Sequence, residues 1–165
     1  MKKLLVIRHA KSSWDHPGLS DKDRPLNTRG LRDAPYMAQI IANILQGSLH
    51  IISSPAARAL NTALIFNQNI NPLGTEINVN ELLYYGNEED YLETIRNVND
   101  SVQTLAIFGH NPNIEYFVMK SNAGRLDAIP TCAVILYELE LEHWANINWE
   151  SLKMINKYFP KEQSF

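Results

Sequence analysis

The chain has 165 residues, of which 45% are hydrophobic and 20% are charged, and its formal net charge at pH 7 is -3. This length allows one sizeable hydrophobic core, so we expect a single domain over residues 1–165. The slight negative charge excludes a general attraction to nucleic acid or to anionic membranes, and any phosphate affinity must come from a local cluster.

The amino-terminal residues carry no pattern typical of export. Only four apolar residues separate Lys3 from Arg8, which is too short for a signal peptide, and no later run approaches membrane-spanning length. The single cysteine, Cys132, excludes an internal disulfide and lies in an apolar run, where we expect a small core residue. We therefore expect a cytoplasmic protein.

In chain order, short apolar runs alternate with segments of helical periodicity, which is typical of a parallel sheet with helices on its faces. Residues 4–7 are the first apolar run and predict a buried strand. A helix is then predicted that ends at Gly47. Pro35 favours a start near Asp33, because proline disrupts a helix interior. Residues 51–53 predict a second strand.

Two further helices are predicted from a cap residue followed by proline. Ser54 marks the start of one, whose buried face is expected to hold alanines together with Leu60 and Leu64. Asn111 marks the start of the other. Between them, residues 91–98 carry apolar side chains at helical spacing and predict a helix of their own.

Strands are predicted again after the last helix. Residues 131–136 are nearly continuously apolar, whereas residues 137–142 alternate with glutamate, which indicates an exposed half near a sheet edge. Residues 149–155 predict the last strand, and Trp144 and Trp149 are expected to cover the sheet edge. The predicted fold is therefore α/β, a three-layer α/β/α sandwich whose mostly parallel central sheet is flanked by helices.

Cationic and imidazole side chains follow three of the predicted strands. Arg8 and His9 end the first strand, Arg58 follows the second, and His110 follows the strand predicted over residues 104–108. An isolated Arg-His pair would more simply begin a solvated loop, but ligands bind at the carboxyl ends of parallel strands, where these side chains converge. Two guanidinium groups and one imidazole suit phosphoryl oxygens, and the other imidazole can act as the nucleophile.

The sequence contains no conventional metal or nucleotide motif. Its five histidines are scattered singly, and the patterns CxxC, HExxH, GxGxxG and the phosphate-binding loop ending in GK[S/T] are absent. We therefore expect a reaction that needs no metal and no other cofactor. His16, His50 and His143 are expected to be ordinary surface or half-buried residues.

Four segments stand out in chain order: Arg8-His9-Ala10 with the loop after it, residues 25–30, Ser53-Ser54-Pro55 with Arg58, and Gly109-His110-Asn111-Pro112. In this order they resemble the histidine phosphatase (phosphoglycerate mutase-like) superfamily. The short length and the lack of a large insertion are most similar to the bacterial phosphohistidine phosphatases of the SixA type. Ala10 departs from the usual glycine by one methyl group, which limits how closely the backbone approaches a substrate.

The resemblance implies a role for each matching residue. His9 attacks phosphorus and becomes transiently phosphorylated, while Arg8, Arg58 and His110 hold the phosphoryl oxygens. Water then hydrolyses the phosphohistidine intermediate. The resemblance therefore implies a phosphatase with a covalent intermediate on the enzyme.

The resemblance is less direct for three polar residues. Ser12 and Asp15 fall where related enzymes place small polar residues at the rim of the phosphate pocket. Glu81 lies in roughly the segment that holds the general acid of larger members, but its spacing to Gly86 differs by one residue from the mutase pattern. Both an acid role and a structural role stay open for Glu81. Arg24 is interpreted as a surface charge on a loop.

The predicted function is a metal-independent phosphatase that removes phosphate from a histidine in a protein. The conjugate acid of an imidazole leaving group has a pKa of about 6.5, whereas that of an alkoxide has a pKa of roughly 16. A phosphoramidate therefore depends less on an acid catalyst, and the open role of Glu81 favours such a substrate. Two alternatives stay open: a small-molecule phosphomonoesterase or mutase of the same superfamily, and a non-catalytic phosphate-binding module. We expect no nucleic-acid or membrane partner, and the sequence leaves the oligomeric state open.

Overall fold

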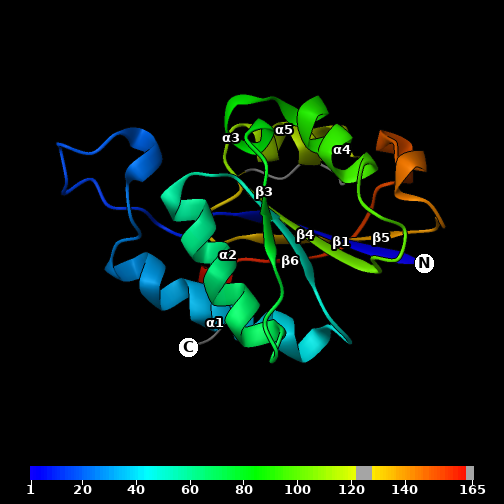
Figure 1. The fold of residues 1–165 in the computed structure, drawn as a ribbon, viewed down its shortest axis with the longest axis horizontal. Coiled ribbons are helices and arrows are strands. Elements are labelled where there is room, and N and C mark those ends of the chain that lie inside the picture. Colours follow the sequence, from blue (N-terminus) through cyan, green and yellow to red (C-terminus); the bar gives the residue numbers. More distant parts are fainter. Residues whose placement is uncertain (122–127, 163–165) are drawn as a thin grey trace.

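The computed structural model describes residues 1–121 and 128–162, and in these ranges six strands form one sheet (Figure 1). The strand order is β3-β2-β4-β1-β5-β6. Neighbouring strands are parallel from β3 to β1, whereas β5 is antiparallel to both β1 and β6. The strands are β1 Lys2–Arg8, β2 His50–Ser53, β3 Ile77–Val79, β4 Thr104–Gly109, β5 Val134–Leu139 and β6 Lys153–Tyr158.

Helices cover both faces of this sheet, and the predicted three-layer α/β/α sandwich is confirmed. The helices form two groups, one on each face of the sheet (Figure 1). Among the described helices, none is long and apolar enough to cross a membrane. On the first face lie α1 (Thr28–Ile44) and α2 (Ala57–Ile70), and on the second lie α3 (Leu82–Tyr85), α4 (Glu88–Arg96) and α5 (Asn113–Lys120).

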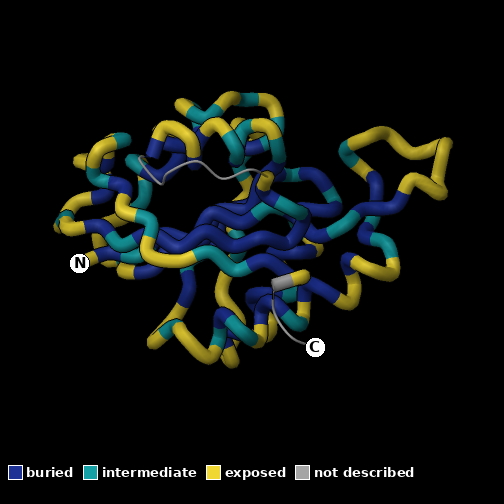
Figure 2. The backbone as a smooth tube through the Cα atoms, turned by 180° about the vertical axis from the view of Figure 1, so that it is seen from behind, coloured by how far each residue is buried: buried dark blue, intermediate teal, exposed yellow. Residues whose placement is uncertain are grey.

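Strand β1 divides its side chains between two hydrophobic clusters, one on each face of the sheet. Leu4 and Val6 belong to the cluster beneath α4 and α5, whereas Leu5 and Ile7 belong to the cluster beneath α1 and α2. This alternation follows from the two-residue period of a strand. Both faces of β1 are buried, so its apolar run is continuous, and the buried layer is visible through the middle of the molecule (Figure 2).

Helix α1 contains Pro35, and the predicted start near Asp33 is wrong. The Asn27 side chain caps the helix by accepting a backbone N–H of the first turn at 2.9 Å. Proline removes the hydrogen bond to the carbonyl of Leu31, four residues earlier. Since both Leu31 and Pro35 are exposed, water can satisfy that carbonyl, and the helix continues through the proline.

The two predicted cap residues do not cap their helices. Helix α2 begins after Ala56, and the Ser54 hydroxyl accepts the Ala56 N–H at 3.2 Å. Helix α5 begins after Pro112, and the Asn111 side chain donates to the carbonyl of Ile129 at 3.0 Å. Both polar side chains are therefore used for contacts near the strand ends.

The buried face of α2 also differs from the prediction. Leu64 is exposed and Leu60 is half-buried, whereas Ala59, Ala63 and Phe66 point into the core. The small alanines let the helix approach its neighbours closely, and Phe66 fills the space beyond them. Helical periodicity identified the helix and its buried alanines, but Leu64 was assigned to the wrong side.

The strand predicted over residues 149–155 is present, but it lies later in the chain. Strand β6 begins at Lys153, because residues Trp149–Ser151 form a 3₁₀ turn capped by the side chain of Asn148. Trp144 does not cover an exposed sheet edge. It is fully buried, and its indole N–H donates to the carbonyl of Val102 at 3.0 Å.

Candidate active site

The side chains predicted to converge do line one cleft, at the carboxyl ends of β1, β2 and β4. The cleft has a volume of about 220 Å³ and includes Arg8, His9, Arg58 and His110. The ring centroids of the two histidines are 5.1 Å apart. Parallel pairing of β1 and β4 places their ends side by side, which is why residues a hundred positions apart meet here. The lining is completed by Lys11, Ser12, Trp14, Arg24, Asn111 and Thr131.

The imidazole of His9 is buried and held by its own backbone. Its Nδ1 lies 2.7 Å from the carbonyl oxygen of Ala10. A carbonyl only accepts hydrogen bonds, so Nδ1 carries the proton and Nε2 keeps its lone pair. Burial lowers the pKa of His9 to about 3, and the charges of Arg58 and Arg8 act in the same direction. His9 is therefore neutral at pH 7, which is the nucleophilic form.

His110 is held by two hydrogen bonds, one to its ring and one to its backbone. Its Nε2 lies 2.7 Å from the Ser54 hydroxyl, and its backbone N–H donates to the Tyr91 hydroxyl at 3.1 Å. Burial, together with the nearby charge of Arg58, lowers the pKa of His110 to about 3. Its Nδ1 is buried without a partner among the described residues. When the Ser54 hydroxyl donates to Nε2, this Nδ1 carries a proton that a ligand oxygen can accept.

The guanidinium groups of Arg8 and Arg58 are anchored at their terminal nitrogens. Arg8 donates from Nη1 to the carbonyl of Ile129 at 2.8 Å, and Arg58 donates from Nη1 to the carbonyl of Asp21 at 2.7 Å. The Nε of each arginine is buried and has no partner in the described part of the chain. Buried donors are nearly always paired in folded proteins, so this arrangement suits an anionic ligand such as a phosphoryl group.

Arg24 is a cleft residue, and its interpretation as a surface charge is wrong. Its exposure is 8%, and its Nη1 donates to the Ser12 hydroxyl at 2.8 Å. The guanidinium carbon lies 3.6 Å from the centroid of the Trp14 ring, a cation–π geometry. Asp21, three residues earlier, forms a salt bridge with Arg24, and this i,i+3 spacing is the sequence signal that could have indicated a held arginine.

The three residues placed only by resemblance have different surroundings. Ser12 is buried and lines the cleft, whereas Asp15 is exposed and does not line it. The Glu81 carboxylate lies outside the cleft lining, with its side chain 61% exposed, and binds Lys22 Nζ at 3.0 Å. Within residues 1–121 and 128–162, no three or more His, Cys, Asp or Glu side chains are grouped so as to hold a metal ion.

A backbone feature that no sequence pattern indicated holds the end of β1. Cys132 adopts φ of 61°, and its N–H donates to the carbonyls of both Arg8 and His9, at 3.1 and 3.0 Å. A positive φ is uncommon outside glycine, so these contacts stabilise an unfavourable conformation where it orients the two cleft residues. The Cys132 side chain is free and buried, as predicted for a core residue.

Ala10 fits its position without a left-handed backbone. In the described residues, Cys132 is the non-glycine residue with positive φ, so Ala10 needs no glycine-specific conformation. The Ala10 side chain is buried, and its N–H donates to the Thr62 hydroxyl at 3.0 Å. The extra methyl group is therefore accommodated in the core behind the cleft.

Residues 4–105 match the sequence model of the histidine phosphatase superfamily, branch 1. An uncharacterized chloroplastic protein of Arabidopsis thaliana is 30% identical over 123 residues, which are 69% of this chain and 56% of that protein. The chain thus spans little more than half of that relative. An uncharacterized protein of Mycobacterium tuberculosis is 27% identical over 165 residues, covering 94% of this chain and 100% of that protein.

Solved structures show the same architecture. A SixA protein of Agrobacterium tumefaciens, assigned as a phosphohistidine phosphatase, has 26% identity and a TM-score of 0.79, covering 96% of this chain and 98% of its own. The protein histidine phosphatase SixA complexed with tungstate shares the fold, with 22% identity, a TM-score of 0.75, and coverage of 97% of this chain and 98% of its own. A mycobacterial glucosyl-3-phosphoglycerate phosphatase shares it more distantly, with 13% identity, a TM-score of 0.62, and coverage of 93% and 96%. The chain therefore belongs to the histidine phosphatase superfamily and is SixA-like.

Proposed function

We propose that this protein hydrolyses phosphohistidine in a protein substrate, through a transient phosphate on His9. The observation that carries the proposal is the hydrogen bond between His9 Nδ1 and the Ala10 carbonyl. It leaves a neutral imidazole with a free lone pair at Nε2, in the cleft that Arg8 and Arg58 line. A nucleophile and cationic donors in one cleft are the parts that phosphoryl transfer requires.

The reaction has two steps. In the first, His9 Nε2 attacks phosphorus, and the phosphorus bond to the substrate imidazole breaks with its electron pair going to that ring. In the second, water attacks the phosphorus on His9, the Nε2–P bond breaks, and the electron pair returns to Nε2. The water protons leave with inorganic phosphate. In both steps the guanidinium N–H groups stabilise the charge on the three equatorial oxygens.

The cleft composition favours a nitrogen-linked phosphate over an ester. An alkoxide leaving group needs a proton donor, because its conjugate acid has a pKa of roughly 16. The described residues that line the cleft include no carboxylate, and Glu81 binds Lys22 instead. A protonated phosphoimidazole releases a neutral ring, whose conjugate acid has a pKa of about 6.5. The similarity to the SixA protein of Agrobacterium tumefaciens supports the same substrate class.

A substrate panel tests the proposal. Phosphohistidine protein, phosphoramidate, an aryl phosphate and sugar phosphates are each assayed with a chelator present. We expect turnover that resists the chelator and ranks the two nitrogen-linked phosphates first. Preference for a sugar phosphate would instead support a small-molecule phosphomonoesterase or mutase. Tight phosphate binding without turnover, and without an acid-labile label on the protein, would support a non-catalytic binding module.

A further inference from the structure

The carboxylate of Asp21 lies between two arginines of the cleft. One oxygen accepts a hydrogen bond from Arg58 Nη2 at 3.0 Å, and the other accepts one from Arg24 Nε at 3.2 Å. Tyr84 adds a third donor, because its hydroxyl donates to the Asp21 carboxylate at 2.7 Å. Both arginines are almost fully buried, whereas the Asp21 side chain is 51% exposed. Asp21 is thus the counterion of two buried cations.

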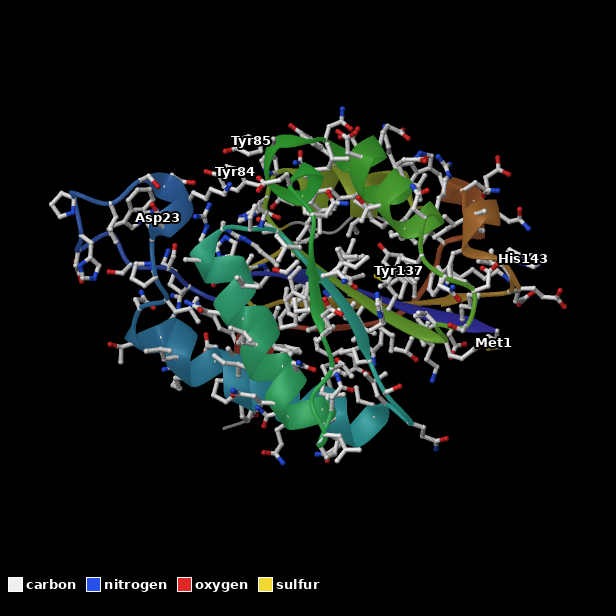
Figure 3. All side chains as sticks on the ribbon, viewed as in Figure 1. Met1, Asp23, Tyr84, Tyr85, Tyr137 and His143 are labelled. Carbon is white, nitrogen blue, oxygen red and sulfur yellow. The ribbon has the colours of Figure 1, made fainter. Side chains whose placement is uncertain are left out.

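Asp21 lies in the segment that connects β1 to α1, and this segment projects from the body of the protein (Figure 1). Residues Asp21–Asp23 form a 3₁₀ turn there, and Tyr84 and Tyr85 of α3 lie beside it (Figure 3). Lys22 also joins the turn to the residue before α3, through its ion pair with Glu81 at 3.0 Å. The turn therefore connects the cleft arginines to α3 through charged groups.

The Asp21 carboxylate is ionised at every pH used in an assay. Its partial burial alone would raise its pKa, but the hydrogen bonds from Tyr84 and Arg58 outweigh this effect and lower the pKa to about 2. A negative charge bound to both guanidinium groups offsets part of their positive charge, so it weakens their attraction for another anion. The effect applies to the substrate phosphoryl group and to the phosphate product.

We propose that Asp21, as the counterion of Arg58 and Arg24, lowers the affinity of the cleft for inorganic phosphate, so that the product leaves. The inference rests on the proposed function and deepens it. A cleft with Arg8, Arg24 and Arg58 and no counterion would bind a phosphate dianion tightly and release it slowly. With Asp21 present, the affinity of the cleft is high enough to hold the phosphoryl group during transfer and low enough to release inorganic phosphate.

The variant Asp21→Asn removes the charge and keeps the shape of the side chain. We expect the dissociation constant of inorganic phosphate, measured by calorimetry, to fall about tenfold, since one nearby unit charge is lost. In turnover, KM and kcat are both expected to fall, because product release becomes slower. Asp21→Ser removes the same charge and is expected to tighten phosphate binding to a similar extent.

Asp23→Asn is the matched control. Asp23 lies in the same turn and is exposed, and its carboxylate accepts a hydrogen bond from the Ser20 hydroxyl at 2.8 Å. Removing this charge is expected to change phosphate affinity by less than about twofold, since exposed charges are screened by salt. Asp21→Glu keeps the charge and is expected to bind phosphate within about threefold of wild type.

A purely structural role for Asp21 would give the opposite result. Loosened arginines bind phosphate more weakly, so unchanged or weaker binding in folded Asp21→Asn and Asp21→Ser would overturn the inference. Phosphate binding is measured without turnover. A wild-type protein that binds phosphate but hydrolyses none of the panel substrates would therefore contradict the proposed function, while the comparison of phosphate affinities would still be decisive for Asp21.

Discussion

His9 donates a hydrogen bond from Nδ1 to the carbonyl oxygen of Ala10, its own neighbour, at 2.7 Å. The acceptor belongs to the backbone, so the tautomer of His9 is set without an acidic side chain. Most histidine nucleophiles need a partner at Nδ1 to present Nε2. Here the turn after β1 supplies it, and Cys132 holds that turn through hydrogen bonds to the carbonyls of Arg8 and His9.

Replacing the nucleophile tests the covalent step. We expect His9→Ala to lower turnover by at least about a thousandfold, because no other group can form the intermediate. An acid-labile phosphate label, trapped on wild type by rapid quenching, is expected to be absent from the variant. Circular dichroism serves as the folding control. A label that persists in His9→Ala would assign the intermediate to another residue.

Acid is expected to destabilise the protein through its two cleft histidines. Burial lowers the pKa of His9 and of His110 to about 3, whereas the unfolded value is about 6.5. Between these values the unfolded chain binds protons that the folded chain does not, so the free energy of unfolding falls as pH falls below 6.5. The loss is about 2 kcal/mol per histidine at pH 5.

Urea denaturation at pH 7.5 and at pH 5 measures this loss. In His110→Asn the decrease between the two pH values is expected to be about half of that in wild type, because one of the two buried imidazoles is gone. Asp21 does not disturb the comparison. Its pKa is lowered to about 2, so its contribution to stability is lost only when the pH falls below its unfolded value of 3.8. An equal decrease in both proteins would contradict the assignment.

Gly109 is predicted to be intolerant of a side chain. A Cβ at this position would overlap the ring and hydroxyl of Tyr91, which donates to the Leu83 carbonyl at 2.8 Å and accepts the N–H of His110 at 3.1 Å. Gly109→Ala is therefore expected to lower the free energy of unfolding by about 1 to 3 kcal/mol and to reduce kcat by displacing His110. Thermal or urea denaturation and turnover measure the two effects.

Gly18→Ala is the control for that substitution. No atom lies within 4 Å of a Cβ built at Gly18, and its φ is not in the left-handed region. The change in stability is expected to be within about 0.5 kcal/mol. If the two alanine variants are equally stable and equally active, the close contact between Gly109 and Tyr91 is not needed to hold His110 in place.

Glu81→Gln tests whether the enzyme is built to hydrolyse phosphoramidates or alkyl phosphate esters. The Glu81 carboxylate binds Lys22 outside the cleft lining, so phosphoramidate hydrolysis is expected to stay within about threefold of wild type, as for loss of an exposed ion pair. The measurement is kcat/KM on phosphoramidate and on an alkyl phosphate. A selective loss of at least about thirtyfold on the alkyl phosphate would identify Glu81 as the general acid of an ester hydrolase.

Much of the site was predictable because strand ends are marked locally. Arg8 and His9 directly follow an apolar run, and His110 follows another with one glycine between. Arg58 comes soon after a third. The first two runs are continuous apolar stretches of the kind that a parallel strand buried on both faces requires. The rule that ligands bind at the carboxyl ends of such strands then places these side chains in one cleft without any distance being known.

Other predictions were wrong because local pattern does not report burial. Pro35 was expected to exclude the first turns of α1, but its helix face is exposed and water can replace the lost hydrogen bond. Ser54 and Asn111 look like helix caps, yet their side chains are used near the strand ends, where His110 and Ile129 approach from elsewhere in the chain. Cap residues and proline carry weak local preferences that tertiary contacts override.

By itself, the sequence determined the α/β class, the order of the longer helices and strands, and the histidine and arginine side chains at the strand ends, because these depend on periodicity along the chain. The short elements β3 and α3 were not predicted, since three or four residues carry too little periodic pattern. Tertiary structure alone decided that Arg24 is buried, that Asp21 neutralises it together with Arg58, and that Cys132 holds the end of β1. The reason is physical: residues 21–24 lie in a polar loop, and its contacts come from Arg58 of α2, Tyr84 of α3 and Ser12 after β1. Contacts between segments that are distant in sequence produce no periodic pattern of residues within either segment, so the sequence of one segment does not predict them.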